Sequence, residues 1–147
     1  MTFELDKKIA ADTAALGETE RYVIRLANDS RFPWVILIPK VASVTEVYQL
    51  DNGFQQQLAV DSAQLGLEMM ALYKGDSFNS GALGNVVRQL HIHHVVRFEN
   101  DDAWPGPIWG FESAVAYSDE QLGSQVEKLR AGLSLLVRHS REGGNPS

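Results

Sequence analysis

The most constraining feature of the chain is a run of alternating side chains at residues 86–98, which holds three of its four histidines. Successive side chains of a β-strand point to opposite faces, so a strand here places Gln89, His91 and His93 on one surface. The opposite surface then carries residues 90, 92, 94 and 96, three of them aliphatic. A strand with an apolar face must pack on a second layer, so the run predicts a layered fold containing a sheet.

The row formed by Gln89, His91 and His93 is a candidate active site. Imidazole can serve near neutral pH as a nucleophile, a general acid or base, or a metal ligand. His94 lies on the aliphatic surface instead. For this residue we expect a buried, structural histidine that is hydrogen-bonded to a backbone carbonyl.

The remaining periodicities predict an α+β fold with helices packed on an antiparallel sheet. The longest helix is expected at 54–73, where apolar residues recur near a period of 3.6, after a break at 51–53 and before a stop at Gly75. Ser118 and Gln121 have the spacing of a capping box, which predicts a last helix from about residue 119 to 136.

The other predicted elements are shorter. We expect a short helix over residues 3–17 that ends at Gly17, and an antiparallel hairpin of strands 21–27 and 34–39. A helical turn is expected at 45–50, and extended segments at 77–84 and 86–98. The tryptophan-bearing, Pro- and Gly-rich loop at 104–110 should pack against other residues, because tryptophan is costly to leave in water.

Composition limits both size and class. With 147 residues and 44% apolar content the chain can build one sizeable core, so we expect a single domain over residues 1–137. The polar, Gly- and Pro-bearing residues 138–147 predict a disordered tail, and they resemble the translation product of a dispersed bacterial repeat element. We expect no site role for His139 in this tail.

Charge and residue usage exclude several kinds of partner and location. The formal charge of −6 argues against nucleic-acid binding, which needs a basic surface. The chain has no cysteine and no long apolar run, and its first residues do not resemble a signal peptide, so we expect a cytoplasmic protein without membrane partners. A small anionic substrate remains possible, because backbone N–H groups and a few side chains can hold it.

The histidine row could also begin a metal site, since His91 and His93 share a surface. The sequence offers no suitable third ligand. Glu99 lies six positions beyond His93, which is too far, and the one histidine outside the run is His139. We therefore expect no bound metal.

Residues 84–97 resemble the motif of the histidine triad (HIT) family, in which a Gly-Gln-Ser/Thr-Val approach precedes His-x-His-x-His with apolar spacers. Residues 26–40, ending in Pro-Lys, resemble the nucleotide-binding hairpin of that family, and residues 44–51 resemble its connecting helix. The resemblance covers about residues 20–98. It implies an antiparallel sheet of about five strands with a long helix and a C-terminal helix packed on it.

The chain departs from the family motif at four positions. Gln89 replaces the first histidine, Asn85 the glutamine and Val86 the hydroxyl residue, and His94 occupies an apolar slot. With the Trp-Pro-Gly-Pro loop, this pattern resembles a bacterial branch of the family. Gln89 can still orient its neighbours through its amide, but it cannot exchange a proton between pH 5 and 8, so we expect weakened or retuned catalysis.

The resemblance implies a role for each matching residue. His91 would attack the α-phosphate of a nucleotide, giving a nucleotidyl-histidine that water hydrolyses, with His93 holding the phosphoryl oxygens. We expect the second ring nitrogen of His91 to donate to a backbone carbonyl. The substrate-binding residues implied by the resemblance are Asn28, Asp29, Asn79, Gly84, Asn85 and Val86.

The expected function is that of a nucleotide phosphohydrolase or nucleotidyl transferase, acting on dinucleoside polyphosphates or phosphoramidates without a cofactor. Two alternatives remain: a nucleotide-binding module with little turnover, and nucleotidyl transfer to a sugar phosphate. The family also implies a homodimer, which would cover an otherwise unpaired sheet edge.

Overall fold

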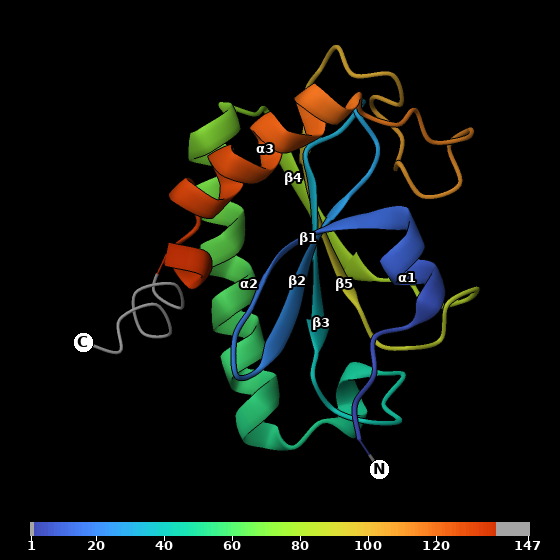
Figure 1. Ribbon diagram of the computed structural model, residues 1–147, viewed down its shortest axis with the longest axis vertical. Coiled ribbons are helices and arrows are strands. Elements are labelled where there is room, and N and C mark those ends of the chain that lie inside the picture. The colour runs from blue at the N-terminus through green and yellow to red at the C-terminus, as the bar shows by residue number, and fades with distance from the viewer. Residues whose placement is uncertain (1, 138–147) are drawn as a thin grey trace.

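A computed structural model describes residues 2–137 and shows an α+β fold. Five strands form one antiparallel sheet in the order β1-β2-β3-β5-β4 (Figure 1). The elements in chain order are α1 (Lys7–Asp12), β1 (Thr13–Glu18), β2 (Tyr22–Ala27), β3 (Trp34–Pro39), the 3₁₀ turn η1 (Val47–Gln49), α2 (Asn52–Tyr73), β4 (Ser77–Ala82), β5 (Ile92–Arg97) and α3 (Asp119–Gly132). The predicted fold class is therefore confirmed.

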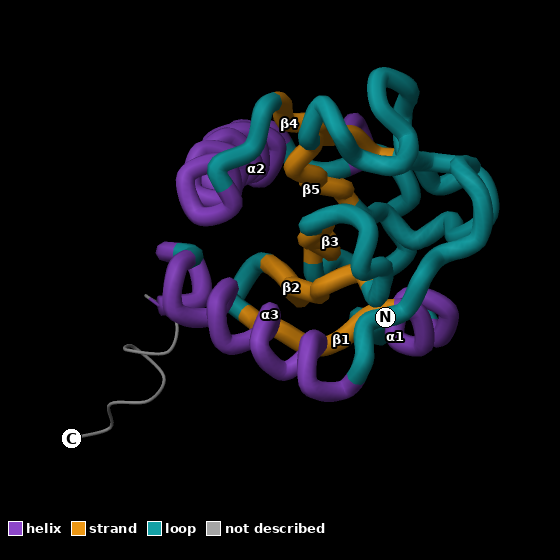
Figure 2. Tube along the Cα trace, turned by 90° about the horizontal axis from the view of Figure 1, so that it is seen from above, coloured by secondary structure: helices purple, strands orange, loops and turns teal. Residues whose placement is uncertain are grey.

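The sheet separates a large core from a smaller one, and the alternation of side chains assigns residues to each. Tyr22, Ile24 and Leu26 of β2 pack in the large core with residues of α2 and α3. Val23 and Ala27 pack on the other face with Ile9 of α1. Figure 2 shows α2 and α1 on opposite sides of the sheet. The face that carries α1 is the one on which the functional site lies.

The hairpin of β2 and β3 is present as predicted, and its register sets the position of later residues. Val23 pairs with Ile38 and Leu26 with Val35. On its other side β3 pairs with β5, where Ile36 lies opposite His93. Directly opposed residues point to the same face, so His93 lies on the α1 face of the sheet.

The predicted helix over residues 3–17 is wrong in its second half. The Asp6 side chain caps a helix that covers only Lys7–Asp12, and the chain then pairs with β2 as an edge strand. The alanines at 14 and 15 favour a helix by intrinsic propensity, but the strand places Leu16 in the large core. Gly17 is not a helix stop. A Cβ atom there would lie 2.8 Å from the Leu136 side chain, so glycine admits close packing.

The long helix starts earlier than predicted. Asp51 accepts a hydrogen bond from the backbone N–H of Phe54 and acts as the N-cap, so Asn52 and Gly53 belong to the first turn and not to a break. At the other end Lys74 takes the left-handed conformation with φ of 55°, one residue before the predicted stop. The capping box of Ser118 and Gln121 is confirmed. Helix α3 ends at Gly132, and residues 134–137 are helical again after a break at Leu133, so the predicted extent to residue 136 is interrupted once.

The histidine strand is shorter than predicted. Strand β5 begins at Ile92, and the preceding residues 83–91 form an irregular segment after β4. The tryptophan-bearing loop follows β5 without regular structure. None of the helices in the described part of the chain is both long and apolar enough to cross a membrane. The tail prediction for residues 138–147 lies outside the described residues.

Candidate active site

His91 and His93 lie side by side at the start of β5. Their ring centroids are 4.8 Å apart and the ring planes are nearly perpendicular, at 79°. Both residues are buried, with 7% and 6% of their surfaces exposed. The predicted neighbourhood of the two imidazoles is thus present, although only His93 belongs to the strand itself.

The hydrogen bond of His91 defines its tautomer. Its Nδ1 atom lies 2.7 Å from the backbone carbonyl oxygen of Gln89. A carbonyl oxygen only accepts, so Nδ1 carries the proton and donates it, as expected from the sequence. In the neutral ring the Nε2 atom then keeps its lone pair, which is the form that a nucleophilic imidazole requires.

His93 has the opposite arrangement. The indole Nε1 of Trp34 donates to its Nδ1 over 3.0 Å, and because an indole N–H can only donate, Nδ1 must be unprotonated. The neutral ring therefore carries its proton on Nε2. Burial, followed by the charges that His91 and His94 would carry, lowers the pKa of His93 to about 3, so it is a neutral N–H donor at physiological pH.

His94 faces the large core and has no exposed surface. Its Nδ1 lies 3.3 Å from the carbonyl oxygen of Val35, and its Nε2 lies 2.6 Å from the hydroxyl of Ser62 on α2. The carbonyl accepts from Nδ1, so the hydroxyl donates to Nε2. Burial lowers the pKa of His94 to about 4. The structural role predicted for this histidine is confirmed.

Two adjoining hollows meet at the histidine pair. The first, of about 370 Å³, is bounded by α1, the end of β2 and the start of β3. The second, of about 560 Å³, lies between the segment at 83–87 and the loop at 108–114. The residues common to both are Lys8, Asp29, Trp34, Val87, His91, His93 and Ala114. A molecule in either hollow therefore lies beside both imidazoles.

Most of the predicted substrate-binding residues surround these hollows. Asn28 lines the first, Asp29 lines both, and Asn85 and Val86 line the second. Gly84 lines neither, but a Cβ atom there would approach the carbonyl oxygen of Val87 to 3.0 Å, so glycine allows the tight course of this segment. The structure thus brings together segments separated by more than 50 residues in the sequence.

The polar groups of the 28–31 turn are already engaged. The Asn28 amide oxygen accepts from the backbone N–H of Tyr117. The buried Asp29 carboxylate accepts two side-chain hydrogen bonds from Arg31. Burial opposes the ionisation of Asp29, but the bonds from Arg31 outweigh it and hold its pKa below the usual value. The turn is therefore fastened to the later loop and stiffens the wall of both hollows.

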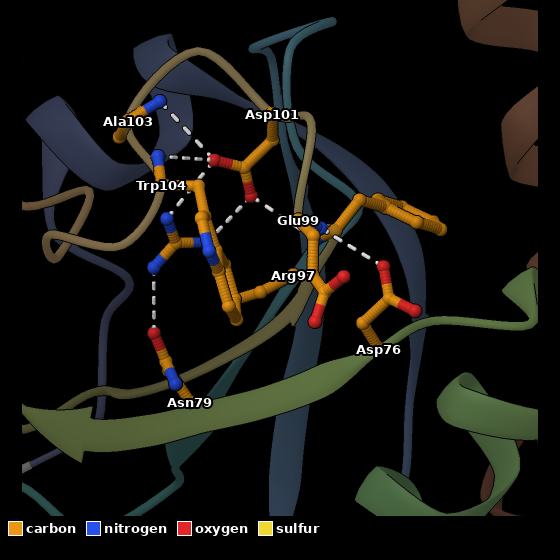
Figure 3. Close-up of polar contacts among 8 residues, drawn as sticks. Asp76, Asn79, Arg97, Glu99, Asp101, Ala103 and Trp104 are labelled. Carbon is orange, nitrogen blue, oxygen red and sulfur yellow. Dashed lines mark hydrogen bonds and ion pairs between the residues drawn. The ribbon is translucent and has the colours of Figure 1, made fainter.

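Asn79 is not part of this site. Its amide oxygen accepts from Arg97, which also makes a two-pronged ion pair with Asp101, at 2.7 Å and 3.0 Å (Figure 3). Asp101 in turn accepts from the backbone N–H groups of Ala103 and Trp104. This cluster is structural: it organises the turn after β5 from which the tryptophan-bearing loop departs.

The Gln89 side chain does not contact either imidazole through a hydrogen bond. Its amide donates to the carbonyl oxygen of Glu4 over 2.7 Å and accepts from the N–H of Asp6 over 2.8 Å. The sequence row is split for this reason: residues 89 and 91 precede the strand, so strict alternation does not apply to them. Gln89 reaches the histidine pair through its backbone oxygen alone.

Three contributors to the site were not among the expected catalytic or binding residues. Trp34 was placed in a strand, but its contact with His93 depends on the register between β3 and β5. Trp109 lies with its ring centroid 5.6 Å from that of His93 and lines the second hollow, whereas Trp104 stacks on Arg97. Helix α1 supplies Lys8 and Ile9 to the first hollow. A clue to Trp109 was its position in a loop where a large aromatic ring must be covered.

Within residues 2–137 no cluster of three or more histidine, aspartate or glutamate side chains is arranged to hold a metal ion. The ionisable side chains common to both hollows are those of Lys8, Asp29, His91 and His93. Two imidazoles whose Nδ1 atoms have opposite hydrogen-bonding roles, next to a cationic side chain, can serve nucleophilic attack beside an oxyanion.

The fold and the histidine pair define the class of protein. The family model of the HIT domain matches residues 8–100, and the chain belongs to this family. A search of curated proteins gave no match.

Solved structures show which proteins the chain is similar to. A histidine triad protein from Marinobacter aquaeolei is 46% identical, with a TM-score of 0.89 over 92% of this chain and 99% of the other. A second one, from Sinorhizobium meliloti, is 36% identical, with a TM-score of 0.86 over 90% and 98%. A diadenosine triphosphate hydrolase from Plasmodium falciparum shares the fold at 17% identity, with a TM-score of 0.55 over 92% and 81%.

Proposed function

We propose that the chain hydrolyses or transfers nucleotides at their α-phosphate through a covalent bond to His91. The observation that carries this proposal is the hydrogen bond from His91 Nδ1 to the Gln89 carbonyl oxygen, which places the lone pair of the neutral ring on Nε2, in a residue that lines both hollows. The diadenosine triphosphate hydrolase of the same fold supports the reaction class. Dinucleoside polyphosphates and nucleoside phosphoramidates are the substrate types that we propose.

In the first step the Nε2 lone pair of His91 attacks phosphorus and forms a P–N bond, while the bond to the leaving group breaks and its electron pair departs with that group. The imidazole becomes cationic, and the Gln89 carbonyl stabilises it through Nδ1–H. In the second step water attacks phosphorus, the P–N electrons return to Nε2, and the proton of water passes to solvent. The chain supplies the nucleophile itself, so the proposed reaction needs no cofactor.

His93 serves this reaction as a neutral donor. Its Nε2–H group, defined by the bond from Trp34 to Nδ1, can donate to a phosphoryl oxygen on the phosphate that His91 attacks. Lys8 borders both hollows, and its ammonium, which is paired with Asp12 at 2.9 Å, can also attract an α-phosphate and its neighbours. Each group acts on charge that grows in the transition state.

The test uses a fluorogenic adenosine phosphoramidate and a dinucleoside polyphosphate as substrates. We expect His91→Ala to lose turnover by at least roughly a thousandfold, as removal of a covalent nucleophile does. His139→Ala is the matched control, because it removes a histidine outside the motif. If the wild type and His91→Ala turn over at the same slow rate, the enzyme proposal fails.

One observation favours a second function, that of a nucleotide-binding module. The first motif histidine is Gln89, and its side chain is bound to residues 4 and 6 instead of to the histidine pair. A binder would hold adenosine phosphates without forming a covalent product. Intact-mass measurement after a brief, acid-free quench distinguishes the two, since the enzyme accumulates a nucleotidyl adduct that His91→Ala cannot form.

We also propose that the protein is a homodimer. Strands β1 and β4 are the two edges of the described sheet, and a sheet edge can pair with a second chain. On β1 the carbonyl oxygens of Ala15 and Leu16 already accept from Arg130. On α2 the side chains of Val60 and Leu67, seven residues apart on one stripe, are 63% and 66% exposed. An exposed apolar stripe beside a sheet edge is the kind of surface that a second copy would cover.

A further inference from the structure

We infer that Gln89 is a positioning residue that fastens the N-terminal segment as a wall of the substrate cavity. Its amide forms one hydrogen bond to Glu4 and one to Asp6. The effect on substrate rests on the proposed function, whereas the fastening itself does not depend on it.

The Gln89 amide pairs with the backbone as a neighbouring strand would. The carbonyl oxygen of Glu4 and the N–H of Asp6 flank Leu5, and in an extended chain these two groups point the same way. The amide offers a donor and an acceptor side by side, at 2.7 Å and 2.8 Å from them. A histidine in this position has its two ring nitrogens directed away from each other, so it cannot satisfy both groups.

The fastened segment leads directly into helix α1. The N–H of Asp6 is held by Gln89, and the Asp6 carboxylate caps the helix by accepting from Lys8 N and Ile9 N, at 2.8 Å and 3.2 Å. With six residues α1 is far too short to be stable by itself. Its position depends on such anchors and on the packing of Ile9 against the sheet.

Helix α1 is a wall of the first hollow. Lys8, Ile9 and Asp12 line this hollow together with His91 and His93. Gln89 therefore acts on both sides of the cavity: its side chain sets the wall, and its backbone oxygen sets the tautomer of His91. A substitution of Gln89 removes the side-chain bonds that hold the wall but retains the backbone oxygen that sets the His91 tautomer. We therefore expect weaker substrate binding with the chemical step preserved.

The experiment compares Gln89→Glu with Gln56→Glu in the full-length chain. Gln89→Glu keeps the acceptor for Asp6 but turns an oxygen toward the Glu4 carbonyl in place of the donor. Gln56 is exposed on α2, which lies against the opposite face of the sheet, so Gln56→Glu controls for the change in net charge, while local repulsion of an anionic substrate is excluded by an uncharged variant. Gln89→Met has a similar length without any polar partner and is the second variant.

We expect amide hydrogen exchange at residues 7–12 to be roughly tenfold faster in both Gln89 variants and unchanged in Gln56→Glu. With an adenosine phosphoramidate we expect KM to rise about tenfold while kcat stays within about twofold. Binding of AMP should weaken by the same factor as KM rises.

Three results would overturn the inference. Unchanged exchange at residues 7–12 would show that Gln89 does not hold the segment. Faster exchange with an unchanged KM and AMP affinity, or a fall in kcat alone, would show that the wall does not set binding. A Gln89→His variant with higher kcat and undisturbed exchange would mark Gln89 as a weakened catalytic group instead. If the wild type hydrolyses nothing, the proposed function fails, while exchange and AMP binding still decide this inference.

Discussion

At the scale of single residues, the two site histidines differ in the nitrogen that carries the proton, and backbone and indole partners set this difference. His91 donates from Nδ1 to a carbonyl, and His93 accepts at Nδ1 from Trp34. On the proposed function, the same side-chain type thus supplies both a nucleophile and a hydrogen-bond donor. In the neutral rings, the Nε2 atom of His91 carries a lone pair and the Nε2 atom of His93 carries a hydrogen.

Trp34→Phe tests this assignment. The variant keeps an aromatic ring but removes the N–H that defines the His93 tautomer, so Nδ1–H and Nε2–H forms become mixed. We expect kcat to fall roughly fivefold to tenfold, the worth of about one hydrogen bond, with little change in KM. The tautomer is measured directly by nitrogen NMR of His93.

Trp104→Phe is the matched control for that variant, because Trp104 contacts Arg97 and not the histidine pair. An unchanged His93 tautomer in Trp34→Phe would contradict the assignment.

At the scale of elements, the loop after β5 depends on one ion pair. Arg97 is 1% exposed, lies between the rings of Phe32 and Trp104, and pairs with Asp101. Burial opposes the ionisation of Asp101, but its bonds from Arg97 and the backbone outweigh this and keep its pKa below the usual value. The side chains of this ion pair are only 2% and 3% exposed.

We expect Asp101→Ala to lower the free energy of unfolding by about 3–5 kcal/mol, because it leaves the Arg97 charge buried without a partner. The measurement is urea unfolding followed by far-ultraviolet circular dichroism. Asp102→Ala changes the exposed neighbour and should cost less than about 0.5 kcal/mol. Equal effects of the two substitutions would show that the cluster in Figure 3 contributes no specific stability.

At the scale of the whole molecule, two buried histidines make stability depend on pH. The pKa of His93 is lowered from 6.5 to about 3 and that of His94 from 6.5 to about 4. Between pH 6.5 and these values the unfolded chain binds protons that the folded protein does not. The stabilisation is therefore complete above pH 6.5 and is lost as the pH falls.

We expect the free energy of unfolding to fall between pH 6 and pH 5 by about 1.4 kcal/mol per pH unit for each of the two histidines. The lowered carboxyl pKa values of Asp29 and Asp101 act only below about pH 4, so they do not interfere. Urea titrations at successive pH values give the slope. His93→Gln should halve it, and a flat profile in the wild type would contradict the burial of the neutral rings.

The proposed dimer is also a property of the whole molecule. Leu67→Lys places a charge on the exposed stripe of α2, and we expect it to convert the dimer to a monomer in light scattering coupled to size-exclusion chromatography. Tyr48→Lys is the control, since Tyr48 is 77% exposed on η1 and lies outside that stripe. If Leu67→Lys remains a dimer like Tyr48→Lys, or if the wild type is a monomer, the proposed surface is contradicted.

The sequence by itself determined four of the five strands of the sheet, the long helix, and where the histidines are. These features depend on local periodicity and caps: alternation placed His94 in the core, and a 3.6-residue repeat defined α2. A local pattern failed where long-range pairing outweighed propensity, as in β1, whose alanines pair with β2.

Only the tertiary structure decided what each site residue contacts. The bond of Trp34 to His93 follows from the register of two strands 59 residues apart, and that of Gln89 to residues 4 and 6 spans more than 80 residues. Periodicity carries no information on such register or on the course of an irregular segment. The row that the sequence presents as Gln89, His91 and His93 is therefore, in three dimensions, a histidine pair and a separate amide that holds the opposite wall.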